Sequence, residues 1–188
     1  MERYLGAATL MLMLGMVLAR VLLMRSAGIK AMKFGQTDKS DFMIPPFAFF
    51  YFYIVFAAAF GFPTVTRQAF FQSAIVSWVG VVLCLAGLCL LFLSLVSFGR
   101  SFSVGIDADH PNKLVTTGVF ALSRNPVYVA FWLVLLGEFL IFPNWVLMIY
   151  LLAAMWLFHR QVKREEQYLA KHYGQEYTDY CLRVRRYF

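Results

Sequence analysis

Two long uncharged stretches limit what this chain can fold into. Residues 43–62 contain no charged side chain in 20 residues, and residues 74–98 contain none in 25. About 20 helical residues cross the hydrocarbon core of a bilayer, where a charged side chain is costly. Each stretch therefore predicts a transmembrane helix.

A third candidate span, Leu5–Leu23, is apolar except for Arg20 near its end. It has neither the basic start nor the small-residue cleavage site of a signal peptide, so we interpret it as a retained helix. The composition agrees, because 61% of the residues are hydrophobic and only 14% are charged. Soluble domains contain about half apolar and a quarter charged residues. The sequence thus predicts an all-α integral membrane protein.

The last apolar stretch, residues 127–158, has 32 residues and one charge, Glu138. As one straight helix it would measure about 48 Å, which exceeds the thickness of a bilayer core. Pro143 and Asn144 lie near its middle, and this pair favours a turn. The stretch therefore predicts a helical hairpin of two short helices, 127–142 and 145–158.

The basic residues support a hairpin. They gather after the first span, after the third span and in the tail 159–188, whereas the loop after the second span holds only Arg67. A return turn at Pro143 and Asn144 puts all three basic segments on one side of the membrane, which the positive-inside rule makes cytoplasmic. About five transmembrane helices are predicted. The net charge of +7 then reflects the topology and an attraction to anionic lipid, and nucleic acid is not an expected partner.

The chain is expected to form a single membrane domain, residues 1–188. Residues 1–98 supply three transmembrane helices, and residues 99–188 hold the hairpin between two polar pieces. The tail predicts a helix over 159–173, a break at Gly174 and a second short helix. These pieces predict a cytoplasmic C-terminal helical cap that can hold a water-soluble cofactor beside a lipid-borne substrate. No metal site is expected, since the histidines and cysteines are scattered.

Two blocks of the sequence carry a family resemblance. "KLVTTGVFALSRNPVY" (113–128) is followed about 36 residues later by "REEQYLAKHYGQEYTDYCLRVRRY" (164–187). Together they resemble the isoprenylcysteine carboxyl methyltransferase family and its phospholipid methyltransferase relatives. The family pattern is roughly HxLVxxGxYxxxRHPxY, a helical hairpin, and then EExxLxxxFGxxYxxYxxxVxR. The resemblance covers about residues 99–188.

The resemblance implies a methyl transfer from S-adenosylmethionine, bound in the cap, to a lipophilic small-molecule or prenylated acceptor that enters from the bilayer. It also implies a set of cofactor-binding residues. They are Asn112, Lys113, Leu114, Val115, Phe120, Asn125, Pro126, Val127, Tyr128 and Glu165.

The chemistry of these residue types fits that cofactor. Backbone groups of 113–115 can bind the edge of adenine, and Phe120 or Tyr128 can contact the adenine or the sulfonium. Glu165 can accept hydrogen bonds from the ammonium or the ribose. Pro126 begins a helix whose free N–H groups suit a carboxylate.

Four positions depart from the family pattern. Asn112 and Asn125 replace histidines, and Phe120 replaces a tyrosine. Gln161 stands where the carboxyl methyltransferases place an arginine that is expected to hold the substrate carboxylate. A neutral amide cannot replace a bidentate arginine. Either a neighbouring arginine takes this role or the substrate is not a prenylcysteine carboxylate.

Three residues are catalytic candidates. Arg124 lies in the first motif, and Arg164 could replace the missing arginine. Glu138 is the only acid inside a predicted span, which marks it as a functional-site hypothesis. Glu166, the second acid of the pair, is expected to face solvent.

Three functions remain open from the sequence. The first is O-methylation of a lipophilic carboxylate or thiol-derived acceptor. The second is phospholipid-type N-methylation, in which the amine must lose a proton and Glu138 could assist. The third is an NADPH-dependent reductase, because sterol reductases share a similar C-terminal cap, although they are much longer.

Overall fold

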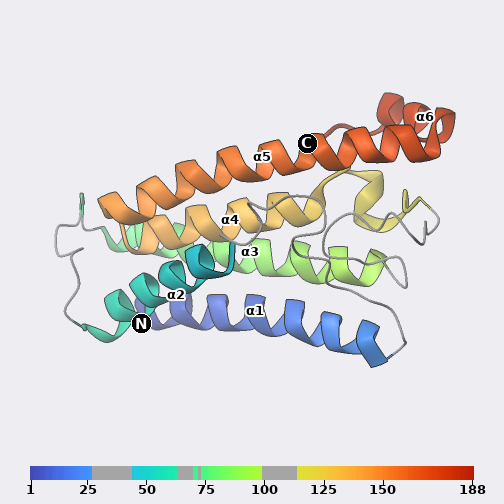
Figure 1. Cartoon of the computed structure of the whole chain (residues 1–188). Helices are drawn as coiled ribbons and strands as arrows, with labels where there is room; N and C mark the ends of the chain where they lie inside the picture. The colour runs from blue at the N-terminus through green and yellow to red at the C-terminus, as the bar shows by residue number, and fades with distance from the viewer. Residues whose placement is uncertain (27–43, 63–69, 72, 99–113) are drawn as a thin grey trace.

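The computed structural model describes residues 1–26, 44–62, 70–71, 73–98 and 114–188. Within these ranges it is entirely helical (Figure 1). The helices are α1 (Glu2–Ser26), α2 (Ile44–Phe60), α3 (Ala74–Phe98), the short 3-10 helix η3 (Gly118–Ala121), α4 (Pro126–Ile141), α5 (Trp145–Tyr173) and α6 (Gln175–Arg183). The prediction of an all-α protein is confirmed.

Three of the helices, α1, α3 and α5, are long and apolar enough to cross a membrane. The bounds of α3 coincide with the predicted span, and α1 extends the predicted first span at both ends. Many of their large apolar side chains are exposed, such as Leu22, Phe92 and Trp156. Such a surface suits contact with lipid tails.

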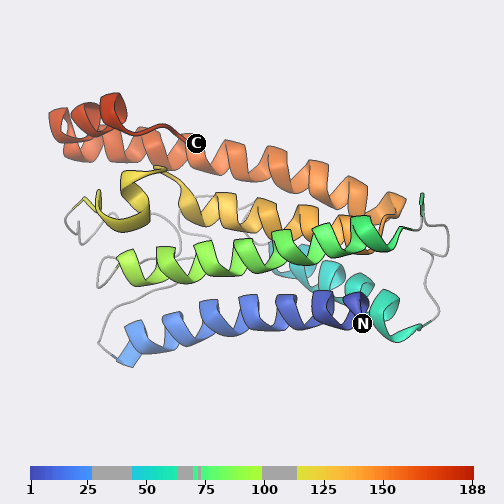
Figure 2. The ribbon, with the colours of Figure 1, turned by 180° about the vertical axis from the view of Figure 1, so that it is seen from behind.

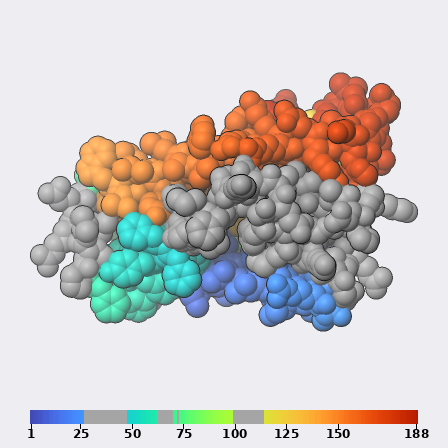
Figure 3. Space-filling model, in the orientation of Figure 1, coloured from blue at the N-terminus to red at the C-terminus, as the bar shows by residue number. Residues whose placement is uncertain are grey.

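The helices lie roughly along one axis, and four of their ends meet at the same end of the bundle. Here α1 and α3 end, α4 begins and α6 follows α5 (Figures 1 and 2). Helix α2 lies beside the N-terminal half of α1, and its side chains lie on the face below α5 in Figure 3. The motifs of both sequence blocks therefore lie at one end of the molecule.

Local sequence explains how α4 and α5 begin and end. Pro126 is the first residue of α4, where its missing N–H costs nothing. Asn144 precedes α5, and its side-chain oxygen accepts from the N–H of Leu147 at 3.0 Å. Gly174 ends α5 with a φ of +54°, a conformation that favours glycine. The predicted helices 145–158 and 159–173 are one continuous helix, and the predicted break at Gly174 and the short helix after it are confirmed.

Glycines allow α3 and α4 to form the most extensive helix contact in the bundle. A Cβ atom added to Gly137 would lie 2.5 Å from the carbonyl oxygen of Gly80 and 2.6 Å from the sulfur of Cys84. A Cβ atom on Gly87 would lie 2.8 Å from the carbonyl of Ala130. Small residues let helix backbones approach closely in membranes. This contact fixes α4, which carries the first motif, against α3.

Replacing Gly137 by alanine tests this packing. The added methyl group has no room, so Gly137→Ala should lower the stability of the purified protein by about 1–3 kcal/mol. Thermal unfolding in detergent, followed by tryptophan fluorescence, measures the effect. Gly15→Ala on α1 is the matched control, because nothing lies within 4 Å of its added Cβ. Equal midpoints for the two variants would contradict the packing argument.

Candidate active site

The candidate site lies where the start of α4, the C-terminal half of α5 and the end of the chain meet. After α6 the chain turns back and runs along α5 (Figures 1 and 2). The N–H of Arg124 donates to the carbonyl oxygen of Arg185 at 3.0 Å. We call residues 184–188 the C-terminal strap. The strap brings residues from the end of the second sequence block into contact with the first.

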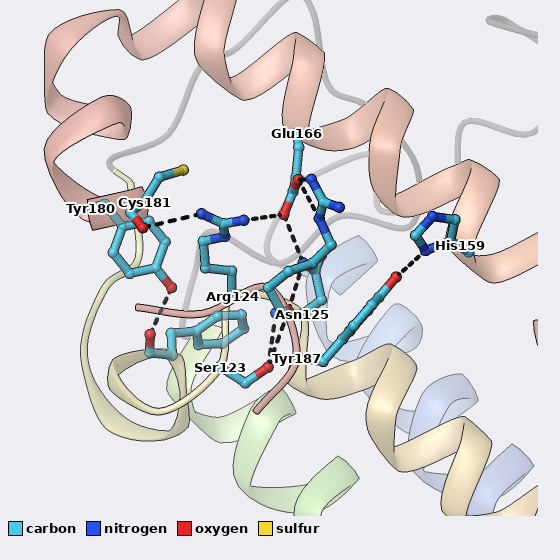
Figure 4. Close-up of polar contacts among 10 residues, drawn as sticks. Ser123, Arg124, Asn125, His159, Glu166, Tyr180, Cys181 and Tyr187 are labelled. Carbon is cyan, nitrogen blue, oxygen red and sulfur yellow. Dashed lines mark hydrogen bonds and ion pairs between the residues drawn. The ribbon is translucent and has the colours of Figure 1, made fainter. Parts of the chain in front are cut away.

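Glu166 is the centre of the polar contacts in this region. Its Oε1 lies 3.1 Å from Nη2 of Arg124 and accepts from Nδ2 of Asn125 at 3.2 Å. Its Oε2 lies 2.7 Å from Nη2 and 2.8 Å from Nε of Arg186. Figure 4 shows Arg124 and Asn125 reaching Glu166 of α5 from the start of α4. One carboxylate thus joins three segments that are far apart in the sequence.

The expectation that Glu166 faces solvent is wrong, because the residue is buried, with 9% of its surface exposed. A buried carboxylate is stable only when it is paired and hydrogen-bonded, and both arginines supply that pairing. The hydrogen bond to Glu166 in turn raises the pKa of Arg186. Arg186 therefore remains charged.

Asn125 is also buried, and its amide group is oriented by the same network. Its Nδ2 donates to Glu166 and, at 3.1 Å, to the carbonyl oxygen of Arg186. Its backbone N–H donates to the hydroxyl of Ser123 at 3.2 Å, and that hydroxyl donates to the same Arg186 carbonyl at 3.4 Å. Although Asn125 is the N-cap residue of α4, its side chain does not cap the helix.

A second polar contact joins α4 to α5. The hydroxyl of Tyr128 donates to Oε1 of Glu165 at 2.6 Å, and Nε2 of Gln161 donates to the same oxygen at 3.0 Å. Tyr128 and Glu165, which were both predicted to bind the cofactor, are partly buried. Within the part of the chain that the structure describes, no cation pairs with Glu165. Among the described residues, the contacts of this carboxylate are therefore with the neutral groups of Tyr128 and Gln161.

An aromatic cluster closes the site towards α6. The Tyr180 hydroxyl donates to the carbonyl oxygen of Phe120 at 2.6 Å, and the rings of Phe120 and Phe98 are 4.5 Å apart. Burial raises the pKa of Tyr180 to about 12, although the nearby Arg124 acts in the opposite direction. The hydroxyl therefore stays protonated and continues to donate. Leu114 packs against the same cluster.

The other predicted cofactor residues are distributed around this region. Val115 is partly buried just before η3, and Pro126 is fully buried at the start of α4. Val127 packs against a cluster formed by α1 and α3. Asn112 and Lys113 lie outside the described residues.

Two catalytic candidates have contacts in the described part of the chain. Besides Glu166, Arg124 contacts the carbonyl oxygen of Cys181 through Nη1 at 3.4 Å. Glu138 is fully buried, about 15 Å further along α4 than Tyr128. Its Oε1 lies 4.0 Å from the sulfur of Cys84. The structure therefore brings Arg124 to the site but places Glu138 in the bundle core.

Arg164 is partly buried on α5, next to the acidic pair. Among the described residues, no three His, Cys, Asp or Glu side chains lie together in a group that could hold a metal ion.

Sequence reasoning missed the strap. Besides the contacts of Arg186, the hydroxyl of Tyr187 lies 2.8 Å from Nδ1 of His159 on α5, and the ring of Tyr187 is 4.6 Å from that of Trp132 on α4. The "VRRY" at the end of the second block could have indicated that this segment matters, since the family pattern includes VxR at these positions. The pattern did not show which side chains those residues contact.

Residues 75–176 match the phospholipid methyltransferase family. This range runs from α3 into α6 and includes both sequence blocks up to Glu176. The chain belongs to this family. The resemblance to isoprenylcysteine carboxyl methyltransferases and their phospholipid methyltransferase relatives is confirmed.

Curated relatives of this family member are similar over the same part of the chain. A probable protein-S-isoprenylcysteine O-methyltransferase of Oryza sativa subsp. indica is 31% identical over 112 residues, which cover 58% of this chain and 59% of the relative. Protein-S-isoprenylcysteine O-methyltransferase B of Arabidopsis thaliana is 30% identical over 56% of this chain and 55% of its own length. The enzyme of Schizosaccharomyces pombe is 36% identical over 48% and 40%. The chain spans little more than half of the first of these relatives.

Replacing Glu166 tests its central role in the fold of this protein. Glu166→Ala leaves two buried or partly buried arginines without their carboxylate and should destabilise the protein by about 3–5 kcal/mol. Loss of tertiary structure on heating in detergent measures this change. Glu176→Ala removes an exposed acid from the first turn of α6 and should cost less than about 1 kcal/mol. Similar losses in both variants would show that Glu166 does not have this role.

Proposed function

We propose that this protein is an S-adenosylmethionine-dependent methyltransferase of the membrane that methylates a lipophilic acceptor reached from the bilayer. The observation that carries the proposal is the family match over residues 75–176, which includes the helices that build the site. The names of the curated relatives add that such chains methylate an S-isoprenylcysteine group.

The residues of the site fit this cofactor. Glu165 is a partly buried carboxylate that accepts only from Tyr128 and Gln161 among the described residues. Leaving a carboxylate without a cationic partner away from water is costly, so the site favours a ligand that carries a positive charge. S-adenosylmethionine carries an ammonium and a sulfonium, and when bound it supplies the methyl group.

Each predicted residue then has a role in binding. Glu165 accepts hydrogen bonds from the cationic or ribose part, and Tyr128 holds the carboxylate in place. Phe120 and the chain around Leu114 and Val115 offer apolar contact for the adenine, with Asn112 and Lys113 also predicted here. Pro126 and Val127 begin α4 and fix its first turn. A carboxylate acceptor needs no deprotonation, so these residues contribute mainly by binding and orientation.

The contacts support different roles for the two candidate arginines. The guanidinium of Arg124 contacts the carboxylate of Glu166 and the carbonyl oxygen of Cys181. We therefore propose that Arg124 stabilises the site and does not bind substrate. Gln161 donates to Glu165 and is therefore oriented towards the acidic group. Arg164 remains our candidate for binding an acceptor carboxylate.

A phospholipid-type N-methyltransferase is the second candidate, and the description of the matched family favours it. In that reaction a base must remove a proton from the amine. Glu138, the proposed base, has none of its surface exposed, so an amine reaches it only if the helices move. This burial is the reason that we place O-methylation first.

We place the site on the cytoplasmic side, at the end of five spans whose last two, α4 and the first part of α5, form a hairpin covered by a helical cap. Basic residues at this end support the proposal, among them Arg25 at the end of α1 and Arg183 at the end of α6 (Figure 1). The positive-inside rule puts such residues in the cytoplasm.

The carboxylate of Glu165 provides the most direct test of this site. Glu165→Gln keeps the size of the side chain but removes its charge, so it should weaken binding of S-adenosylmethionine at least about tenfold. Titration calorimetry in detergent measures the affinity, and Glu176→Gln is the control that removes an exposed acid. Affinity equal to that of the control would remove Glu165 from the site.

An acceptor assay separates the two candidate functions. The protein in vesicles receives methyl-labelled S-adenosylmethionine together with either a prenylated cysteine or phosphatidylethanolamine. Label in a base-labile methyl ester supports O-methylation, whereas label in the amine headgroup supports the second candidate.

A further inference from the structure

Nothing in the family resemblance assigns a role to the particular contacts of the C-terminal strap. Arg186 lies 20 positions beyond Glu166, yet both its side chain and its backbone enter the network at the start of α4. The following argument rests on the proposed function, because it concerns the binding of the same cofactor.

Glu166 on α5 and Arg186 in the strap together use both donors of the Asn125 amide. One goes to Oε1 of Glu166 at 3.2 Å and the other to the carbonyl oxygen of Arg186 at 3.1 Å. Because both partners are acceptors, the amide has one favourable orientation, with its nitrogen towards them. Its oxygen, Oδ1, accepts no hydrogen bond within the described residues. The group that Asn125 can offer to a ligand is therefore an acceptor.

The side chain of Arg186 keeps its carbonyl in that position. Nε and Nη2 both contact Oε2 of Glu166, at 2.8 and 2.7 Å, so two contacts fix the residue against α5. Arg124 and Asn125 share the other oxygen of the same carboxylate. Figure 4 shows Arg124 and Asn125 approaching Glu166 from different directions. If the Arg186 side chain is removed, the carboxylate loses one partner and the Asn125 amide loses a fixed acceptor.

The geometry points to Arg186 as a positioning residue, which holds the Asn125 amide so that its oxygen accepts a hydrogen bond from the ammonium group of the methyl donor. Asn125 and Tyr128 are one helical turn apart at the start of α4, and Tyr128 contacts Glu165. A neutral acceptor and a carboxylate thus lie close together, which suits a ligand with a cationic donor. The asparagine that replaces the family's histidine would have this role without a change of protonation.

Arg186→Gln tests the inference, with Arg185→Gln as the matched control. Both variants lose one charge, but the Arg185 side chain is exposed and forms no hydrogen bond or ion pair with the described residues. Titration calorimetry with S-adenosylmethionine in detergent should show binding weakened about tenfold by Arg186→Gln and unchanged by Arg185→Gln. Equal affinities in the two variants would overturn the inference.

A double-mutant cycle separates positioning from a general loss of structure. In an Asn125→Ala background the amide is absent, so Arg186→Gln should weaken binding less than about twofold. The same tenfold loss in both backgrounds would show that Arg186 only supports the fold. If Arg186→Gln does not fold, Arg186→Lys replaces it in the cycle, since it keeps the charge but not the two contacts with Oε2. A wild-type protein that binds no S-adenosylmethionine would instead refute the proposed function.

Discussion

The site depends on one buried carboxylate. Glu166 lies on α5 and has two arginine partners, one just before α4 and one in the strap. Removing one partner from a buried ion pair costs far more stability than the intact pair contributes, because the remaining charge stays buried without its partner. The pairing therefore determines where the start of α4 and the end of the chain lie relative to α5.

This arrangement explains how the neighbouring acid, Glu165, can serve a ligand. Adjacent residues on a helix point about 100° apart, so the two acids of the pair face different surroundings. Glu166 is neutralised by the protein, whereas Glu165 contacts the neutral groups of Tyr128 and Gln161. One acid of the pair thus stabilises the fold, and the other is the one that we propose binds the cofactor. The close glycine contact between α3 and α4 also stabilises this region, because it fixes α4, the helix that carries Tyr128.

Much of the fold could be predicted from the sequence. The span of α3 follows from an uncharged run with defined ends, and Gly174 marks the end of α5 since nothing before it breaks the helix. The predicted helices 145–158 and 159–173 form one continuous helix, because apolarity stops at residue 158 while helical propensity does not. Apolarity indicates what lies in the membrane, and it does not indicate where a helix ends.

The site could be predicted only in part. The motif assigned Tyr128 and Glu165 to one predicted site, and the structure has the two in contact, since a family pattern preserves which segments meet. It could not show which acid of the pair would be buried, because that depends on the rotation of α5 against α4. The contacts of Arg186 with Asn125 and Glu166 join residues 61 and 20 positions apart, and no local pattern indicates such contacts.

Calorimetric titration of the purified wild-type protein with S-adenosylmethionine and, in parallel, with NADPH tests the account most directly. The account predicts micromolar binding of S-adenosylmethionine and no binding of NADPH. Binding of NADPH alone would move the protein to the reductases, and binding of neither would contradict a cofactor site at the start of α4.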